Sequence, residues 1–214
     1  MLLGNKFVLT QVLEALFPRY CVNCGQEGSL LCATCRLSWE HTPPDKIDHH
    51  LAVYAYANPT VRKLLTTWKY TYDQSAWEIL KTEAEDFLPE IQRFITDNHI
   101  QALLPLPLSE HRLRERGFNQ SEMIAKWLSE KFHLPVIDAL TREHRRGHQA
   151  DKEVDERKAA MQDSPFHLKT GLQIPERILL VDDVYTTGAT LEAAKQSFNL
   201  SQESQVFTFT LAQG

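Results

Sequence analysis

The stretch ILLVDDVYTTGAT, residues 178–190, decides the fold of this chain. Its first four residues are apolar without alternation, which is typical of a central strand of a parallel sheet covered by helices on both faces. Two aspartates follow, and behind them a turn of small and hydroxyl-bearing residues predicts a helix over about 188–200. Strand, turn and helix in this order indicate an α/β protein with a mainly parallel sheet.

The turn has the composition of a phosphate-binding loop. Where a strand delivers its carboxyl end to a helix N-terminus, free N–H groups attract phosphate. The amides and hydroxyls come here from Thr186, Thr187, Gly188, Ala189 and Thr190. Asp182 and Asp183 would repel phosphate, so they favour a neutral diol or a hydrated magnesium ion. A ribose with a 5-phosphate satisfies both halves, and the alternative is an acidic capping turn without a ligand.

Strands and helices alternate along the rest of the chain. Apolar runs predict strands over 51–56, 102–108, 135–140, 177–183 and 205–212, and helical spacing predicts helices over 2–17, 60–68, 76–95 and 119–132. Pro89 predicts a break or kink in the third of these helices, and Asn119 with Glu122 predicts a capping box for the fourth. The polar stretch 141–164 predicts a mobile loop running into a short helix.

Length and composition favour one main domain with a small attachment. The chain has 214 residues, 43% of them hydrophobic, and a net charge of -5. The polar segment HTPPDKIDHH, residues 41–50, reads as a linker, so we place a boundary near Asp48 and expect domains over 1–48 and 49–214. The net negative charge argues against a general nucleic-acid coat protein, so any such binding must be local. With no signal peptide and no run of about 18 apolar residues, we expect a soluble, cytoplasmic protein without a membrane span.

All four cysteines form two C-x-x-C pairs separated by seven residues, and they are Cys21, Cys24, Cys32 and Cys35. Such pairs present four thiolates to one tetrahedral zinc ion, in a closed structural site of zinc-ribbon type. The alternatives are two disulfides, which a reducing compartment disfavours, and four buried free cysteines, which would not explain the spacing. His41, His49 and His50 could compete as ligands, although linker residues are the simpler interpretation.

A second charged cluster follows the strand over 102–108. Arg112, Arg114 and Arg116 leave the carboxyl end of that strand, so we expect them near the same crevice as the aspartates. Guanidinium groups suit the phosphates of pyrophosphate or of a nucleic acid. The alternative is a solvated basic turn, because alternate residues face different ways.

The sequence VDDVYTTGATL resembles the motif with which type I phosphoribosyltransferases bind phosphoribosyl pyrophosphate (PRPP). That resemblance implies that Asp182 and Asp183 bind the ribose hydroxyls, while residues 186–190 hold the 5-phosphate. LPLPLSEHRLRERGFNQSEMIA, residues 104–125, the TWKY of 67–70 and the preceding four-cysteine module are similar to the ComF family, so the resemblance covers nearly the whole chain.

The stretch 141–164 is the weakest part of this resemblance. Arg142, Gln149, Glu156 and Arg157 match the family pattern, whereas Lys152 and Ala160 replace its leucine and asparagine. Because this loop covers the active site in phosphoribosyltransferases, those departures weigh against ordinary transferase catalysis. The loop is locally basic, so it could follow a nucleic-acid backbone or simply be solvated.

Three functions remain open on these observations. The resemblance implies a ComFC-like protein of natural transformation that binds single-stranded DNA and a ComFA-like translocase, with PRPP or a related phosphorylated ribose in the crevice. The alternative is an active phosphoribosyltransferase using PRPP and magnesium, although no residue identifies itself as a catalytic base. The third is a zinc-bearing interaction protein with a vestigial crevice.

Overall fold

A computed structural model describes residues 18–39, 44–45, 47–71, 73–143, 164–198 and 205–214. Its helices are α2 (Ala33–Leu37), α3 (Pro59–Tyr70), α4 (Gln74–Ala84), the 3-10 turn η1 (Glu85–Phe87), α5 (Leu88–Asp97), α6 (Glu110–Arg116), α7 (Gln120–Phe132) and α9 (Ala189–Lys195). Its strands are β1 (His50–Ala55), β2 (Ala102–Pro105), β3 (Leu140–Arg142), β4 (Phe166–Leu168), β5 (Arg177–Tyr185) and β6 (Gln205–Gln213). The helix expected over 2–17 and most of the loop expected over 141–164 lie outside the described residues.

The chain divides into two compact structural units. The first comprises Met1–Thr42 with Ala57–Glu85, and the second comprises Pro43–Tyr56 with Asp86–Gly214. In the first unit, the cysteine segment contacts α3 and α4 through two side-chain pairs: Asn23 donates to Thr60 Oγ1 at 2.6 Å, and Arg36 forms an ion pair with Glu83. The division into a domain over 1–48 and a domain over 49–214, with a boundary near Asp48, stays a prediction.

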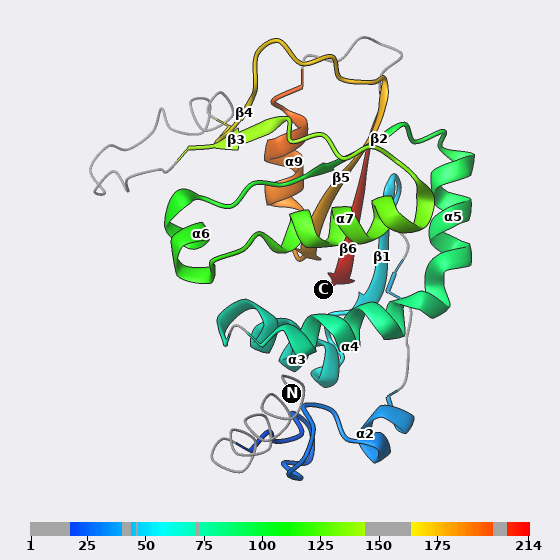
Figure 1. Cartoon of the computed structure of the whole chain (residues 1–214). Helices are drawn as coiled ribbons and strands as arrows, with labels where there is room; N and C mark the ends of the chain where they lie inside the picture. The colour runs from blue at the N-terminus through cyan, green and yellow to red at the C-terminus, as the bar shows by residue number, and fades with distance from the viewer. Residues whose placement is uncertain (1–17, 40–43, 46, 72, 144–163, 199–204) are drawn as a thin grey trace, which may run out of the picture. The chain divides into compact units, whose positions relative to one another are not determined.

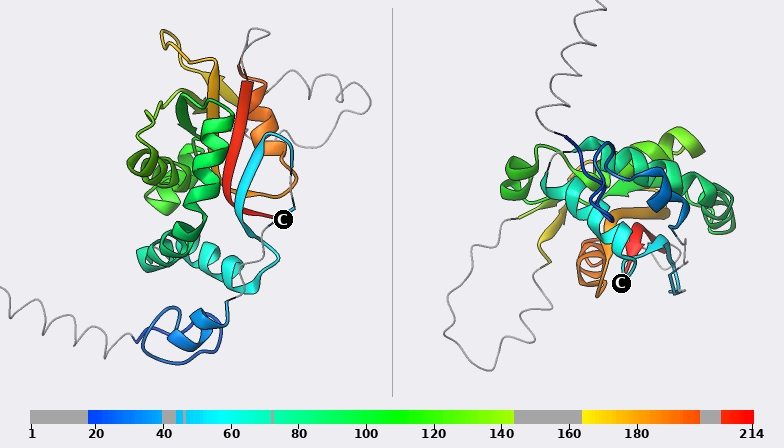
Figure 2. Two further views of the ribbon diagram at one scale, coloured as in Figure 1. Left: turned by 90° about the vertical axis from the view of Figure 1, so that its right-hand side faces the viewer. Right: turned by 90° about the horizontal axis from the view of Figure 1, so that it is seen from below.

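The second unit is built on a parallel sheet in the order β1-β6-β5-β2. In Figures 1 and 2, α5 and α7 cover one face of this sheet and α9 covers the other. Ile178, Leu179, Leu180 and Val181 of β5 are completely buried, as a strand covered on both sides requires. This arrangement confirms the predicted α/β class.

The core on the α9 face of the sheet is continuous with the hairpin β3-β4. It contains Leu104, Leu180, Phe166 and Leu191 among its buried side chains. On the other side, Phe94 of α5 meets Phe207 of β6 edge to face, with ring centroids 6.0 Å apart. Side chains on both faces of the sheet therefore pack against the central strands β5 and β6, which makes these strands rigid.

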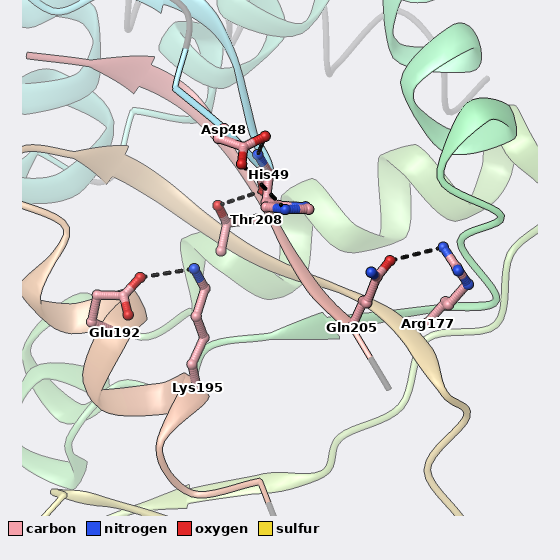
Figure 3. Close-up of polar contacts among 7 residues, drawn as sticks. All are labelled: Asp48, His49, Arg177, Glu192, Lys195, Gln205 and Thr208. Carbon is pink, nitrogen blue, oxygen red and sulfur yellow. Dashed lines mark hydrogen bonds and ion pairs between the residues drawn. The ribbon is translucent and has the colours of Figure 1, made fainter. Parts of the chain in front are cut away.

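Side-chain hydrogen bonds and an ion pair lie around the strands of the sheet. Figure 3 shows Arg177 donating to Gln205 at 2.9 Å where β5 and β6 begin, and Thr208 donating to the carbonyl of His49 at 3.3 Å. The same view shows Lys195 paired with Glu192 within α9 at 2.8 Å. The backbone carbonyl of Tyr185 accepts from Gly214 at 2.8 Å, which ties the end of β5 to the end of β6.

Local sequence signals predicted most of these elements. The break predicted at Pro89 is confirmed, because η1 separates α4 from α5 and Pro89 lies in the first turn of α5. Asn119 caps α7 as expected, accepting from the amide of Ser121, whereas the carboxylate of Glu122 pairs with Lys126. The structure differs at residues 110–116, for which no helix was predicted and where α6 forms, and at 184–185, where β5 continues beyond the expected strand end.

No helix within the described part of the chain is long and apolar enough to span a membrane.

Candidate functional site

The paired acids lie where the central strands end. Asp182 and Asp183 are in the second half of β5, just beyond the point where β2 stops pairing with it at Val181. Asp182 is half-buried and Asp183 is buried. Because the carboxyl ends of parallel strands form the crevice in which ligands bind in such sheets, the two carboxylates stand at the expected place for a ligand.

Asp182 has a hydrogen-bond partner that sequence reasoning missed. The hydroxyl of Ser121, in the first turn of α7, donates to Asp182 Oδ1 at 2.9 Å, and the amide of Asp183 donates to the same oxygen at 2.9 Å. Ser121 stands 61 positions before Asp182, so no local pattern connects the two residues. Only its place two residues after the Asn119 cap could have drawn attention to it.

The turn after the acids is an open depression backed by an aromatic ring. Residues 186–190 connect β5 to α9, and a hollow of about 20 Å³ is lined by Asp182, Tyr185, Gly188 and their neighbours. Thr186, Thr187, Ala189 and Thr190 are exposed, so their hydroxyls and amides are accessible to a ligand. Gly188 is buried with φ at 75°, and a β-carbon there would lie 2.5 Å from the Tyr185 hydroxyl oxygen.

His50 supports Tyr185 from the sheet. The two rings have centroids 4.5 Å apart, and His50 Nδ1 lies 2.8 Å from the hydroxyl of Thr208. Burial, and then the positive charge of Lys195, lower the pKa of His50 to about 4, against the hydrogen bond with Thr208, which raises it. His50 is therefore a neutral structural side chain at neutral pH.

We expect the stability of the fold to fall as the pH drops from about 6.5 to 4. The unfolded chain protonates His50 near its ordinary pKa of about 6.5, whereas the folded chain does so near 4. Between these values the unfolded state binds more protons, so the free energy of unfolding decreases with falling pH. Urea unfolding midpoints at pH 7 and 4.5 should therefore differ more for the wild type than for His50→Gln.

The exposed His167→Gln variant is the matched control and should retain the wild-type pH dependence. An equal fall in stability for wild type and His50→Gln would contradict the prediction.

The three arginines of the second cluster have different environments. Arg112 and Arg114 are exposed on α6, and Arg114 pairs with Glu110. Arg116 is only 7% exposed, and its guanidinium donates to Gln120 Oε1 at 3.2 Å. Arg116 therefore has a packing role at the start of α7, which leaves Arg112 and Arg114 as the accessible cations of this cluster.

Arg142 joins the surroundings of the acids. Burial lowers the pKa of Arg142, the charge of Arg112 lowers it further, and the carboxylate of Asp182 opposes both effects. Arg142 of β3 is therefore affected by charges from two other elements, α6 and β5. The guanidinium of Arg142 also lies over the Phe166 ring, 5.0 Å from the centroid.

A larger cavity, of about 590 Å³, opens on the same unit. Arg142 belongs to its lining, and its apolar walls include Pro105, Leu108, Leu113 and Leu140. Its volume is in the range of small-molecule sites. Asp182 and most of the turn line the smaller hollow instead, so the second unit has two candidate binding surfaces.

The four cysteines of the first unit gather as a metal site requires. Their sulfur atoms all lie within 4.8 Å of one another, and Cys24 Sγ is 3.6 Å from Cys32 Sγ. A tetrahedral zinc ion bound at about 2.3 Å needs sulfurs about 3.8 Å apart. Among the described residues this group contains the four cysteines and no histidine, and His41 lies outside the described residues.

The protonation of the thiols also fits a cation. Burial raises the pKa of Cys21, but amide donors of Cys24, Cys32 and Asn23 outweigh it and lower the pKa to about 6. Hydrogen bonding to Cys32 and Cys24 raises the pKa of Cys35 to about 12. The cluster thus favours one thiolate and resists complete ionisation, and a divalent ion would supply the charge that stabilises four thiolates.

Fold and site together define an α/β protein with a paired-acid site at the carboxyl edge of a parallel sheet and a four-cysteine metal-binding module. No family model matches the sequence. Competence protein ComFC of Bacillus subtilis strain 168 is 31% identical over 204 residues, covering 93% of this chain and 80% of that protein. The chain belongs to the ComF family of competence proteins.

Two further relatives agree with this assignment. Competence protein ComFC of Streptococcus pneumoniae strain R6 is 28% identical over 199 residues, covering 92% of this chain and 82% of that protein. Competence protein F of Haemophilus influenzae strain Rd is 23% identical over 186 residues, covering 82% of this chain and 76% of that protein.

Proposed function

We propose that this protein acts in the cytoplasm in DNA uptake during natural transformation. In this role it binds single-stranded DNA and a ComFA-like translocase, and its crevice holds PRPP or a related phosphorylated ribose. The observation that carries the proposal is similarity to proteins named for competence over more than nine-tenths of the chain. Expression in a Bacillus subtilis strain lacking its own ComFC should restore transformation by purified DNA, and failure of a stably expressed protein to do so would count against the role.

The crevice is proposed to divide the ligand between its two halves. Asp182 and Asp183 accept hydrogen bonds from the ribose hydroxyls, while the amides and hydroxyls of residues 186–190 receive the 5-phosphate. The charges of Arg112 and Asp182 both act on Arg142, and a cation in this position suits the pyrophosphate of PRPP or its magnesium complex. Support comes from the position of the acids at the sheet edge and from the exposure of the turn.

Replacing both acids should abolish binding of the sugar. We expect Asp182→Asn with Asp183→Asn to weaken PRPP binding by roughly 100-fold or more, because two charge-assisted hydrogen bonds are lost. Titration calorimetry with PRPP and magnesium measures this. Asp86→Asn with Asp97→Asn removes the same charge from exposed positions and should bind as the wild type does. Equal binding by all three proteins would contradict the assignment of the acids.

The affinity for single-stranded DNA should depend on the accessible cations of α6. We expect Arg112→Ala with Arg114→Ala to weaken binding of an oligonucleotide roughly ten-fold at low salt and to reduce the salt slope by about 1.4, since each phosphate contact on a single strand contributes about 0.7. Gel shifts over a salt series measure both quantities. Arg62→Ala with Arg93→Ala is the matched control, from exposed sites on α3 and α5. A slope unchanged in the α6 variant would remove these arginines from the interface.

A second candidate function is phosphoribosyl transfer to an acceptor. The 590 Å³ cavity favours it, because a transferase needs room for an acceptor and this cavity lies in the same unit as the paired acids. Release of pyrophosphate from PRPP and magnesium, measured across a panel of nucleobases, tests it. Binding of PRPP without pyrophosphate release would leave the role in DNA uptake as the function of the crevice.

A further inference from the structure

A closed ring of hydrogen bonds surrounds the carboxyl ends of β2 and β5. The amide of Leu106 donates to the carbonyl of Val181 at 3.0 Å, and the side-chain amide of Asn119 donates to the carbonyl of Leu106 at 3.0 Å. Asn119 Oδ1 accepts from the amide of Ser121 at 3.1 Å, and the Ser121 hydroxyl donates to Asp182 Oδ1 at 2.9 Å. Since Asp182 follows Val181 directly, the ring is complete.

Ser121 is the member of this ring that reaches the candidate ligand site. Ser121 is 1% exposed, and it lies in the first turn of the 13-residue helix α7. The Asn119 cap fixes the backbone of Ser121, and burial limits the other acceptors within reach of its hydroxyl. The hydroxyl is therefore a fixed donor that faces Asp182.

The two acids are consequently not equivalent. Asp182 Oδ1 accepts from both Ser121 and the amide of Asp183, so both lone pairs of that oxygen are engaged. Its carboxylate plane is thereby set by α7 and the backbone before any ligand arrives. Pre-set groups bind more tightly than mobile ones, because less side-chain freedom is lost on binding.

We infer that Ser121 is a positioning residue that orients the Asp182 carboxylate toward a ribose hydroxyl. The inference rests on the proposed function of the crevice and names a residue that makes it selective for a sugar. The inference also gives the start of α7, which follows the arginine cluster, a role in the paired-acid site. The phosphate-binding turn of residues 186–190 is not part of the ring and should be independent of Ser121.

Ribose 5-phosphate and inorganic phosphate separate the two halves of the site, because both occupy the turn and only the sugar reaches the acids. We expect Ser121→Ala to bind ribose 5-phosphate roughly ten-fold more weakly than the wild type, the effect of one lost hydrogen bond to a charged group. Binding of inorganic phosphate should stay unchanged. Ser121→Thr keeps the hydroxyl and should restore ribose 5-phosphate binding to within about three-fold. Titration calorimetry measures all three proteins, and thermal unfolding confirms that each is folded.

Unchanged affinity of Ser121→Ala for ribose 5-phosphate would overturn the inference. An equal loss for both ligands would also overturn it, since that result indicates general distortion of the sheet edge. If the wild type binds neither ligand, the proposed crevice function fails, and ligand-free crystal structures of wild type and Ser121→Ala then decide the positioning role. A rotated Asp182 carboxylate in the variant supports it, and an unmoved carboxylate overturns it.

Discussion

Replacing Cys32 by alanine is expected to remove the bound zinc and to unfold the cysteine segment of the first unit. Cys32 is buried, its thiol lies 3.6 Å from Cys24 Sγ, and its amide donates to Cys21 Sγ at 3.5 Å. The segment between residues 18 and 39 contains few buried apolar side chains, so we expect metal binding to contribute most of its folding free energy. Structural zinc supplies about 10–16 kcal/mol in zinc-finger peptides.

Metal content and tryptophan spectra measure this outcome. The wild type should contain one zinc ion per chain and Cys32→Ala close to none, and the near-ultraviolet signal of the buried Trp39 should be lost. Thr34→Ala changes an exposed position of α2 outside the thiol cluster and should retain both metal and signal. If the thiols form disulfides instead, a reducing agent and not a chelator would unfold the wild type, and that result would refute the metal site.

Gly188→Ala is expected to destabilise the second unit by about 2–5 kcal/mol and to abolish ligand binding at the turn. Two costs add here. A residue with a β-carbon at φ 75° is strained by about 1–2 kcal/mol. The new carbon would also lie 2.5 Å from the Tyr185 hydroxyl oxygen and 2.7 Å from Tyr185 Cζ, and overpacking costs about 1–3 kcal/mol. The Tyr185 ring cannot move away freely, because it packs against His50.

A glycine elsewhere in the chain separates the two costs. Gly171 has φ at 78° and nothing within 4 Å of its β-carbon position, so Gly171→Ala should show the backbone strain alone. In a Tyr185→Ala background, Gly188→Ala should cost no more than Gly171→Ala, because the clash has been removed. Urea unfolding measures all of these variants. Equal costs for Gly188→Ala in both backgrounds would mean that Tyr185 does not support the turn.

Prediction from sequence succeeded where the signal was local. The apolar run 178–181 predicted a buried central strand because only a strand covered on both faces tolerates it. The C-x-x-C spacing predicted the sulfur cluster because two short knuckles contain all four ligands. Asn119 predicted a helix start because an N-cap acts on amides only a few residues ahead.

Prediction was weaker where partners are distant or the local pattern was misleading. The stretch 110–116 is strongly charged, so it shows no apolar periodicity, yet α6 forms with Ser109 as its cap and Gly117 in the left-handed conformation at its end. Arg116 was grouped with two accessible arginines, and its burial beside Gln120 depends on how α6 meets α7.

By itself the sequence determined the α/β class, the four sulfur ligands and the adjacency of two acids to a glycine turn, because each follows from neighbouring residues. Only the tertiary structure decided that Ser121 holds Asp182, that His50 supports Tyr185 and that Arg112 acts on Arg142. These contacts join residues from separate strands and helices, and their distances depend on how the sheet pairs and how the helices pack on it. Local patterns in the sequence do not specify the distances between residues of separate elements, because these distances exist only in the folded protein.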